Sequence, residues 1–161
     1  MSFKRIVLII LIILWALVIF SFSGQDGDES AGLSRAIVGF FTNNQEMIDL
    51  VEPYVRKLAH FSEYGIGGWL FLLLFRTYEL GDMTVLGLSG IMGAWYALVD
   101  EYHQTLVPGR DGNYYDVAVD VIGCLTGACI MLIIVKIIEA HKEKKKQEKF
   151  EKFKRRVRPG N

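Results

Sequence analysis

Four long apolar runs constrain the fold of this 161-residue chain more than any other feature. They cover residues 6–22, 55–75, 83–99 and 116–138. A helix needs about 20 mostly apolar residues to cross the ~30 Å hydrocarbon core of a bilayer, and each run, taken with its flanks, is long enough. The sequence therefore predicts an all-α membrane protein with four transmembrane helices.

The first run also has features of a signal peptide. Ser21-Phe22-Ser23 has the small-x-small pattern of a cleavage site. The apolar stretch before it is longer than the core of a usual signal peptide, which favours an uncleaved first helix. We therefore count it as the first transmembrane span.

The basic residues are distributed unequally between the two sides of the predicted bundle. With both ends of the chain inside the cell, the Lys and Arg residues that fall outside are Arg35, Arg56, Lys57 and Arg110, out of eighteen. Short cytoplasmic loops of membrane proteins carry such an excess of basic residues. We therefore predict a multi-pass protein of the cell membrane with both termini in the cytoplasm.

Two further segments have amphipathic patterns. Residues 33–41 and 47–54 predict two short helices that lie on the outer membrane interface or, alternatively, against a soluble partner. The pair Asn43-Asn44 separates them, and one of these residues is expected to cap the second helix. Residues 139–161 form a basic cytoplasmic tail, either an amphipathic helix on the anionic inner leaflet or a solvated anchor.

Small residues line one face of the third and fourth runs. They include Gly87, Gly90 and Gly93 in the third run, and Gly123 and Gly127 in the fourth. Small side chains let neighbouring membrane helices approach closely. We therefore expect these faces to be packing surfaces.

Acid, base and amide groups are concentrated in residues 96–120, between the third and fourth runs. The second run adds His60 and Glu63, and the fourth adds Asp120. Spans one and three run outward while spans two and four begin outside, so these groups converge on the outer side. Because an ionisable group inside a membrane is costly, we expect these three residues to face the bundle interior or a wet cavity.

Four roles fit this constellation. His60 with Glu63, or His103 with Glu101 or Asp100, could act as a base and its orienting partner. The spacings His60-x-x-Glu63 and Glu101-x-His103 also fit metal ligands, although such half-motifs arise easily by chance. The basic groups could instead bind a phosphate or carboxylate, or pair with the acids to lock the helix ends. No nucleophile motif such as Gly-x-Ser-x-Gly accompanies them, so the residues leave open whether a reaction occurs.

Four polar blocks follow one another in a recognisable order. They are Phe22-Ser23-Gly-Gln25, Arg56-Lys57-x-x-His60-Phe-x-Glu63-Tyr64, Asp100-Glu101-x-His103-Gln104-x-x-Val-Pro108-Gly109-Arg110 and Asp116-x-x-x-Asp120-x-x-Gly123. In this order they resemble the VanZ-like family of small bacterial membrane proteins. The resemblance implies a cell-envelope protein associated with low-level teicoplanin resistance, and it implies no particular reaction. On this basis residues 1–138 are expected to form a VanZ-like transmembrane domain, with the tail of residues 139–161 outside it.

We therefore expect an outward-facing polar pocket between the second, third and fourth spans that binds or acts on a cell-envelope lipid or a lipid-linked precursor. The alternative is a non-catalytic protein that shields the surface or docks an envelope partner. The expected partners are membrane lipids and such a precursor, with no nucleic acid, and neither a cofactor nor a metal is assigned. The expected catalytic residues are His60, Glu63, Asp100, Glu101 and His103. The expected substrate-binding residues are Gln25, Arg56, Lys57, Gln104, Arg110, Asp116 and Asp120.

Overall fold

The computed structural model describes residues 2–25, 27–110 and 112–157. This part of the chain forms five helices: α1 (Phe3–Ser23), α2 (Gly27–Gly39), α3 (Gln45–Arg76), α4 (Asp82–Gln104) and α5 (Tyr114–Val157). All of them except α2 are long and apolar enough to cross a membrane. The protein is therefore an all-helical, multi-pass membrane protein, as the four apolar runs predict.

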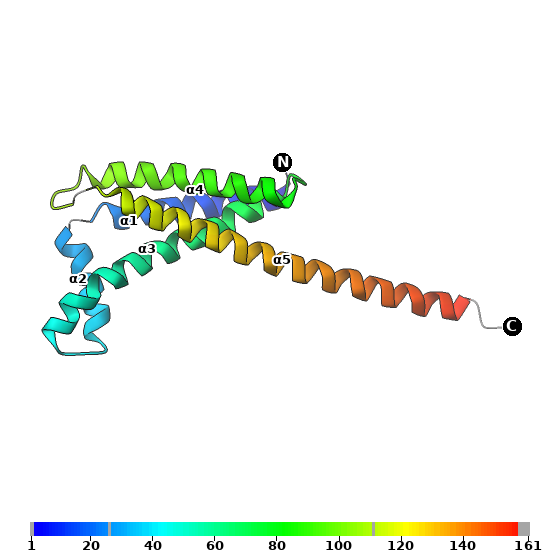
Figure 1. The fold of residues 1–161 in the computed structure, drawn as a ribbon. Helices are drawn as coiled ribbons and strands as arrows, with labels where there is room; N and C mark the ends of the chain where they lie inside the picture. The colour runs from blue at the N-terminus through cyan, green and yellow to red at the C-terminus, as the bar shows by residue number, and fades with distance from the viewer. Residues whose placement is uncertain (1, 26, 111, 158–161) are drawn as a thin grey trace.

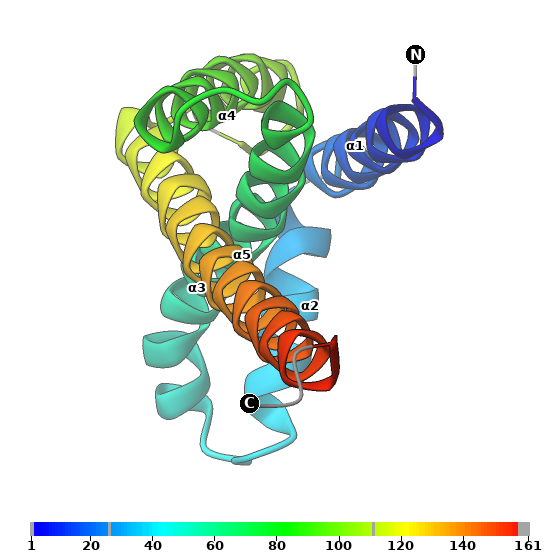
Figure 2. The same ribbon diagram turned by 90° about the vertical axis from the view of Figure 1, so that its right-hand side faces the viewer.

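The long helices pack around α3, which contacts every other helix (Figures 1 and 2). The first half of α5 packs against α3 and α4, and its second half extends away from the bundle (Figure 1). The described side chains of this second half are exposed from residue 137 to residue 157. The basic tail is thus a continuation of the fourth span in one helix and does not fold back along the bundle.

Polar contacts define the end of the bundle at which α3 ends and α4 begins. Arg76 contacts Asp82 Oδ1 at 2.9 Å and Glu139 Oε1 at 2.6 Å. Arg5, at the start of α1, donates from Nε to Thr77 Oγ1 at 3.0 Å. The end of α1, the end of α4 and the start of α5 therefore lie together at the opposite end, which we call the polar end.

Glycines bring the backbones of α3 and α5 into contact. A Cβ atom at Gly127 would lie 2.0 Å from the carbonyl oxygen of Gly65, and one at Gly123 would lie 2.4 Å from that of Phe61. The packing role predicted for the small residues of the fourth span is confirmed at both positions.

On α4, a Cβ at Gly90 would lie 2.7 Å from Leu125 Cδ2 and one at Gly93 would lie 2.4 Å from Cys124 Sγ, so the predicted packing role is also confirmed there. A Cβ at Gly87, by contrast, would meet no atom within 4 Å.

Trp15 ties α1 to the rest of the bundle. Its Nε1 donates to the carbonyl oxygen of Glu63 at 2.8 Å, and its ring meets that of Tyr64 edge-on with centroids 5.9 Å apart. Tyr96 Oη donates to the carbonyl oxygen of Ala16 at 2.5 Å. These contacts fix the depth of α1 relative to α3 and α4.

Two short helices are expected before the second span, and the expectation is wrong for residues 47–54. That segment forms the first turns of α3, where Asn44 caps the helix by accepting from the backbone N–H of Glu46 at 3.0 Å. The helix continues through Pro53, and Arg56 Nη2 lies 3.1 Å from Glu52 Oε1 across this region. An amphipathic pattern is the same for a separate helix and for the extension of a longer one, so periodicity could not place this boundary.

Candidate functional site

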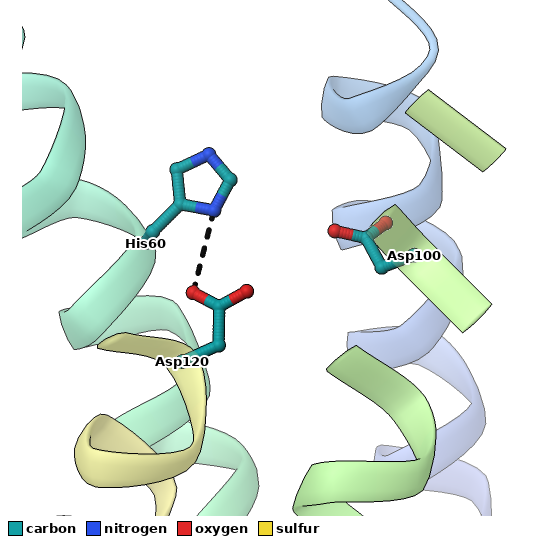
Figure 3. A group of neighbouring side chains, drawn as sticks. All are labelled: His60, Asp100 and Asp120. Atoms are coloured by element: carbon teal, nitrogen blue, oxygen red, sulfur yellow. Dashed lines mark ion pairs between the residues drawn. The ribbon is translucent and has the colours of Figure 1, made fainter. Parts of the chain in front are cut away.

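Three side chains from three helices meet at the polar end (Figure 3). His60 lies on α3, Asp100 near the end of α4, and Asp120 in the second turn of α5. His60 Nδ1 lies 3.5 Å from Asp120 Oδ1. One nitrogen or oxygen atom from each residue can be chosen so that all three lie within 4.8 Å of one another. We call these three residues the floor cluster.

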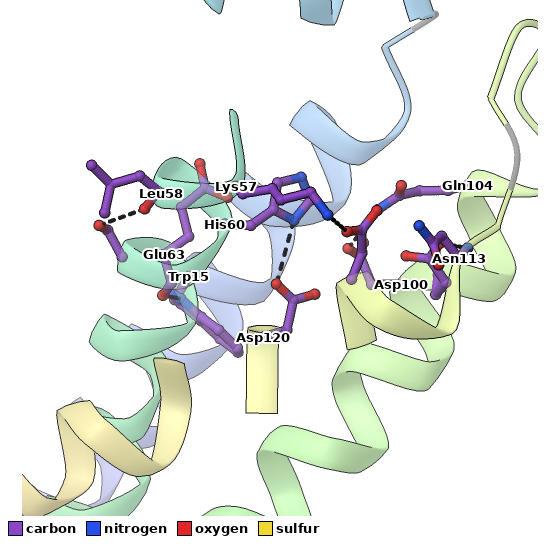
Figure 4. Close-up of polar contacts among 12 residues, drawn as sticks. Trp15, Lys57, Leu58, His60, Glu63, Asp100, Gln104, Asn113 and Asp120 are labelled. Carbon is purple, nitrogen blue, oxygen red and sulfur yellow. Dashed lines mark hydrogen bonds and ion pairs between the residues drawn. The ribbon is translucent and has the colours of Figure 1, made fainter. Parts of the chain in front are cut away.

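The carboxylates of the floor cluster are buried without a full set of partners. Asp100 is 2% exposed and Asp120 is 1% exposed. Gln104, one turn along α4, donates from Nε2 to Asp100 Oδ2 at 3.1 Å (Figure 4). Asp100 Oδ1 and Asp120 Oδ2 have no hydrogen-bond partner among the described residues. Because a buried polar atom without a partner costs free energy, stability alone does not account for this arrangement.

A cavity of about 230 Å³ lies beside the floor cluster at the polar end. Its walls come from α3, from the end of α4 and the loop that follows, and from α5. The lining residues are Pro53, Arg56, Lys57, His60, Gln104, Gly109, Arg110, Asn113, Asp116 and Val119. Three of these side chains are cationic, and they come from two segments that are far apart in the sequence.

The cationic side chains of this cavity are positioned by specific contacts. Lys57 Nζ lies 2.9 Å from Asp116 Oδ1, which joins α3 to α5. Arg110 Nη1 donates to the carbonyl oxygen of Ser23 at 2.7 Å, and Gly109 makes the preceding turn with a φ of 75°. Partial burial is the main cause that lowers the pKa of Arg110, but a guanidinium still stays protonated at neutral pH.

A second cavity, of about 100 Å³, opens on the α1 side of the same cluster. Of these two cavities beside the floor cluster, we call the first the larger cavity and the second the smaller cavity. Arg56, His60 and Arg110 line both cavities, so these side chains lie between the two. Gln25 and Glu63, two of the expected site residues, also line the smaller cavity. Its remaining lining residues are Ile19, Phe22, Ser23, Leu33, Ser34, Ala59 and Asp100.

Two of the expected site residues lie elsewhere. The ring of His103 stacks on Phe20 with centroids 4.0 Å apart, and His103 lines neither cavity. Glu101 Oε1 accepts a hydrogen bond from the backbone N–H of Asn113 and lines a separate, mostly apolar cavity on the α4–α5 side. Among the described residues, His103 forms no ion pair with Glu101, and His60 pairs with Asp120 in place of Glu63. Nor, among the described residues, does His103 form an ion pair with Asp100, so none of the three expected base-and-partner pairings is formed.

Two residues that sequence analysis did not single out also take part. Glu52 is 6% exposed and pairs with Arg56, and its i, i+4 spacing from that residue was a signal available in the sequence. Asn113 lines the larger cavity and positions Glu101 through its backbone, which side-chain chemistry could not reveal.

The family model that describes VanZ/LLP1 proteins matches residues 8–135, which is most of the chain. The chain belongs to the VanZ/LLP1 family. All residues of the floor cluster and of both cavities lie inside the VanZ/LLP1 match, and the basic tail lies outside it. No curated protein and no solved structure matches the chain.

Proposed function

We propose that this VanZ/LLP1 protein binds the anionic headgroup of a cell-envelope lipid or a lipid-linked precursor at its polar end, in the larger of the two cavities beside the floor cluster. The observation that carries this proposal is the shared placement of Arg56, Lys57 and Arg110 around one cavity. Guanidinium and ammonium groups bind phosphate through charge-assisted hydrogen bonds, and arginine can do so with two parallel bonds.

The size and position of the cavity support a headgroup as the ligand. Its volume of about 230 Å³ is several times the ~30 Å³ that a water molecule occupies, so it has room for a phosphate with an attached polar group. It lies between helices that span the membrane, so the acyl or prenyl chain of a ligand can remain in the bilayer. We propose that the polar end faces outward and that both termini are cytoplasmic, because this orientation places most basic residues inside.

The remaining polar residues have distinct proposed roles. Gln104 and Asp116, in the larger cavity, and Gln25, in the smaller one, accept or donate hydrogen bonds to hydroxyl or amide groups of the ligand. His60 is the group placed to exchange a proton with a bound headgroup, because it lines the cavity and contacts Asp120.

Other members of the expected catalytic set act at more distance from the ligand. Glu63 and Asp100 reach the smaller cavity. Glu101 positions the start of α5 through Asn113, and His103 packs the end of α4 on α1. Both therefore support the geometry of the site without touching a headgroup.

Binding of defined lipids to the purified full-length chain tests this proposal. Native mass spectrometry would compare phosphatidylglycerol, a polyprenyl phosphate and a neutral diacylglycerol, for the wild type and for Arg56→Gln and Arg110→Gln. Loss of a charge-assisted hydrogen bond of about 1.5–3 kcal/mol predicts a roughly 10- to 100-fold weaker affinity for the phosphate lipids.

Arg35→Gln provides the matched control. Arg35 lies on α2 and pairs with the exposed Asp49, so the same charge is removed outside the cavity. Equal losses in all three variants would contradict the proposal, as would equal binding of the neutral lipid by the wild type.

A second role, docking of an envelope partner or shielding of the surface without catalysis, is favoured by one observation. Large aromatic side chains are exposed at the polar half of the molecule, including Tyr114 (87%), Tyr115 (78%), Phe40 (86%) and Phe41 (81%). Replacing Tyr114 and Tyr115 together by Ser would abolish a docking role and leave headgroup affinity unchanged. Teicoplanin susceptibility and lipid profiles of cells with each variant would show whether headgroup binding or docking accounts for the effect of the protein on the cell envelope.

A further inference from the structure

We propose that the floor cluster is a binding site for one divalent transition-metal cation, Zn²⁺ or Mn²⁺, held by His60, Asp100 and Asp120. Neither of the metal half-motifs in the sequence contains this combination, because its members are 40 and 20 residues apart along the chain. The site does not depend on headgroup binding and can be tested without any lipid.

The geometry is that of three ligands facing one point from three helices (Figure 3). The three ligand atoms already lie within 4.8 Å of one another, with His60 Nδ1 and Asp120 Oδ1 at 3.5 Å. Neighbouring ligands of a metal with bonds of about 2.1 Å lie roughly 3–3.4 Å apart. Rotation of the Asp100 side chain toward the other two, by about an ångström at its oxygen, would therefore complete the arrangement.

The second observation is that two buried carboxylate oxygens of the cluster have no hydrogen-bond donor in the part of the chain that the structure describes. Asp100 Oδ1 and Asp120 Oδ2 have no hydrogen-bond partner among the described residues, and both side chains are more than nine-tenths buried. Gln104 Nε2 donates to the other oxygen of Asp100, and His60 Nδ1 lies beside the other oxygen of Asp120. A divalent cation would balance the two carboxylate charges and occupy these lone pairs, which helix packing alone does not do.

Two of the neighbouring cations are paired with carboxylates that lie outside the cluster. Arg56 lies 3.1 Å from Glu52, and Lys57 lies 2.9 Å from Asp116, so each already faces a carboxylate outside the cluster. Arg110 donates to the carbonyl oxygen of Ser23.

The donor set narrows the choice of metal. One imidazole nitrogen with two carboxylates suits Zn²⁺ or Mn²⁺, whereas Mg²⁺ and Ca²⁺ prefer oxygen ligands alone. Three protein ligands leave at least one coordination position open, as in metal sites that also bind a substrate or water. That open position would face the larger cavity, since His60 lines it.

Metal titration of the purified full-length chain in detergent tests the proposal. The protein would be stripped with a chelator, and Zn²⁺, Mn²⁺ and Mg²⁺ would be titrated by calorimetry for the wild type, Asp120→Asn, His60→Ala and the control Asp49→Asn. We expect one equivalent of Zn²⁺ or Mn²⁺ on the wild type and on Asp49→Asn. Loss of even an outer-shell partner weakens metal binding 10–100-fold, so the two ligand variants should bind at least about 100-fold more weakly.

Co²⁺ absorption provides a measurement that does not require a variant to fold. A Co²⁺-loaded wild type with visible bands of nitrogen and oxygen ligation supports the site, and a spectrum equal to that of aqueous Co²⁺ overturns it. The proposal is also overturned if the stripped wild type takes up no Zn²⁺ or Mn²⁺, or if folded Asp120→Asn binds them as well as the wild type. None of these results bears on the affinity for a lipid headgroup, which is measured separately.

Discussion

His60 Nδ1 lies 3.5 Å from Asp120 Oδ1 across the interface of α3 and α5, where the Asp120 side chain is buried and that of His60 is partly buried. The two helices meet here because glycines replace larger side chains about one and two turns further along α5, at Gly123 and Gly127. The close backbone contact and the polar pair are therefore parts of one interface. The glycine contact that packs α3 against α5 therefore also sets the position of the candidate site.

Asp120→Asn should separate function from stability. The carboxylate has an oxygen without a partner, so its replacement by a neutral amide should leave the free energy of unfolding unchanged or raise it by roughly 1–3 kcal/mol. Headgroup binding and the effect on teicoplanin susceptibility should both fall. Thermal unfolding in detergent, measured together with lipid affinity, checks this. A large loss of stability in Asp120→Asn would show instead that the carboxylate has a structural role.

Gly127→Ala should disrupt the contact between α3 and α5. The new methyl group would lie 2.0 Å from the carbonyl oxygen of Gly65, and overpacking of this kind costs about 1–3 kcal/mol. Gly87→Ala is the matched control, because nothing lies within 4 Å of the added atom. The free energy of unfolding of Gly87→Ala should be unchanged or higher by roughly 0.5–1 kcal/mol, because alanine lowers the entropy of the unfolded chain. Melting temperatures of the two variants in detergent test this prediction. Equal melting temperatures would be inconsistent with the observed contact.

Lys57→Gln should weaken binding with little change in stability. Its ion pair with Asp116 is partly exposed, and such pairs contribute only about 0–1 kcal/mol. Lys57 also lines the larger cavity, so its loss should lower the affinity for a phosphate lipid roughly 10-fold. Adding Asp116→Asn would remove the negative charge that Lys57→Gln leaves unpaired, and it should not restore affinity. Recovery of affinity in the double variant would mean that the ion pair, and not the lysine, matters.

Glu101→Asp distinguishes a site that needs accurate geometry from a surface that only shields. The shorter side chain withdraws its oxygen from the backbone N–H of Asn113, which would move the start of α5 relative to α4. Misplacement by about 1 Å can reduce the rate of an enzyme about 100-fold, so function should drop strongly while protein levels stay normal. Full activity of this variant in cells would favour shielding.

Labelling of single cysteines tests the proposed orientation. With Cys124 and Cys129 replaced by Ala, a cysteine introduced at Asn44 or Thr105 should react with a membrane-impermeant reagent in intact cells. A cysteine at Glu148, in the extended part of α5, should react only after lysis. The reverse pattern would place the polar end in the cytoplasm and remove the basis for an extracytoplasmic ligand.

The number of spans and the end of the bundle at which the polar groups gather are both predictable from the order of residues alone. Hydropathy and chain direction are enough for both, because alternate spans must bring the ends of α1 and α4 together with the start of α5. The glycine seam at Gly123 and Gly127 was also predictable, since small residues at helical spacing have few uses in a membrane apart from close packing.

The tertiary structure decided which polar groups meet. Each residue advances a helix by about 100°, so a small change in helix rotation turns a side chain from the interior to the lipid. Only packing shows that His60 faces Asp120 in place of Glu63, and that His103 lies against Phe20 outside both cavities. For the same reason, the convergence of Asp100 with Asp120 depends on how α4 and α5 pack around α3, which no local pattern in the sequence encodes.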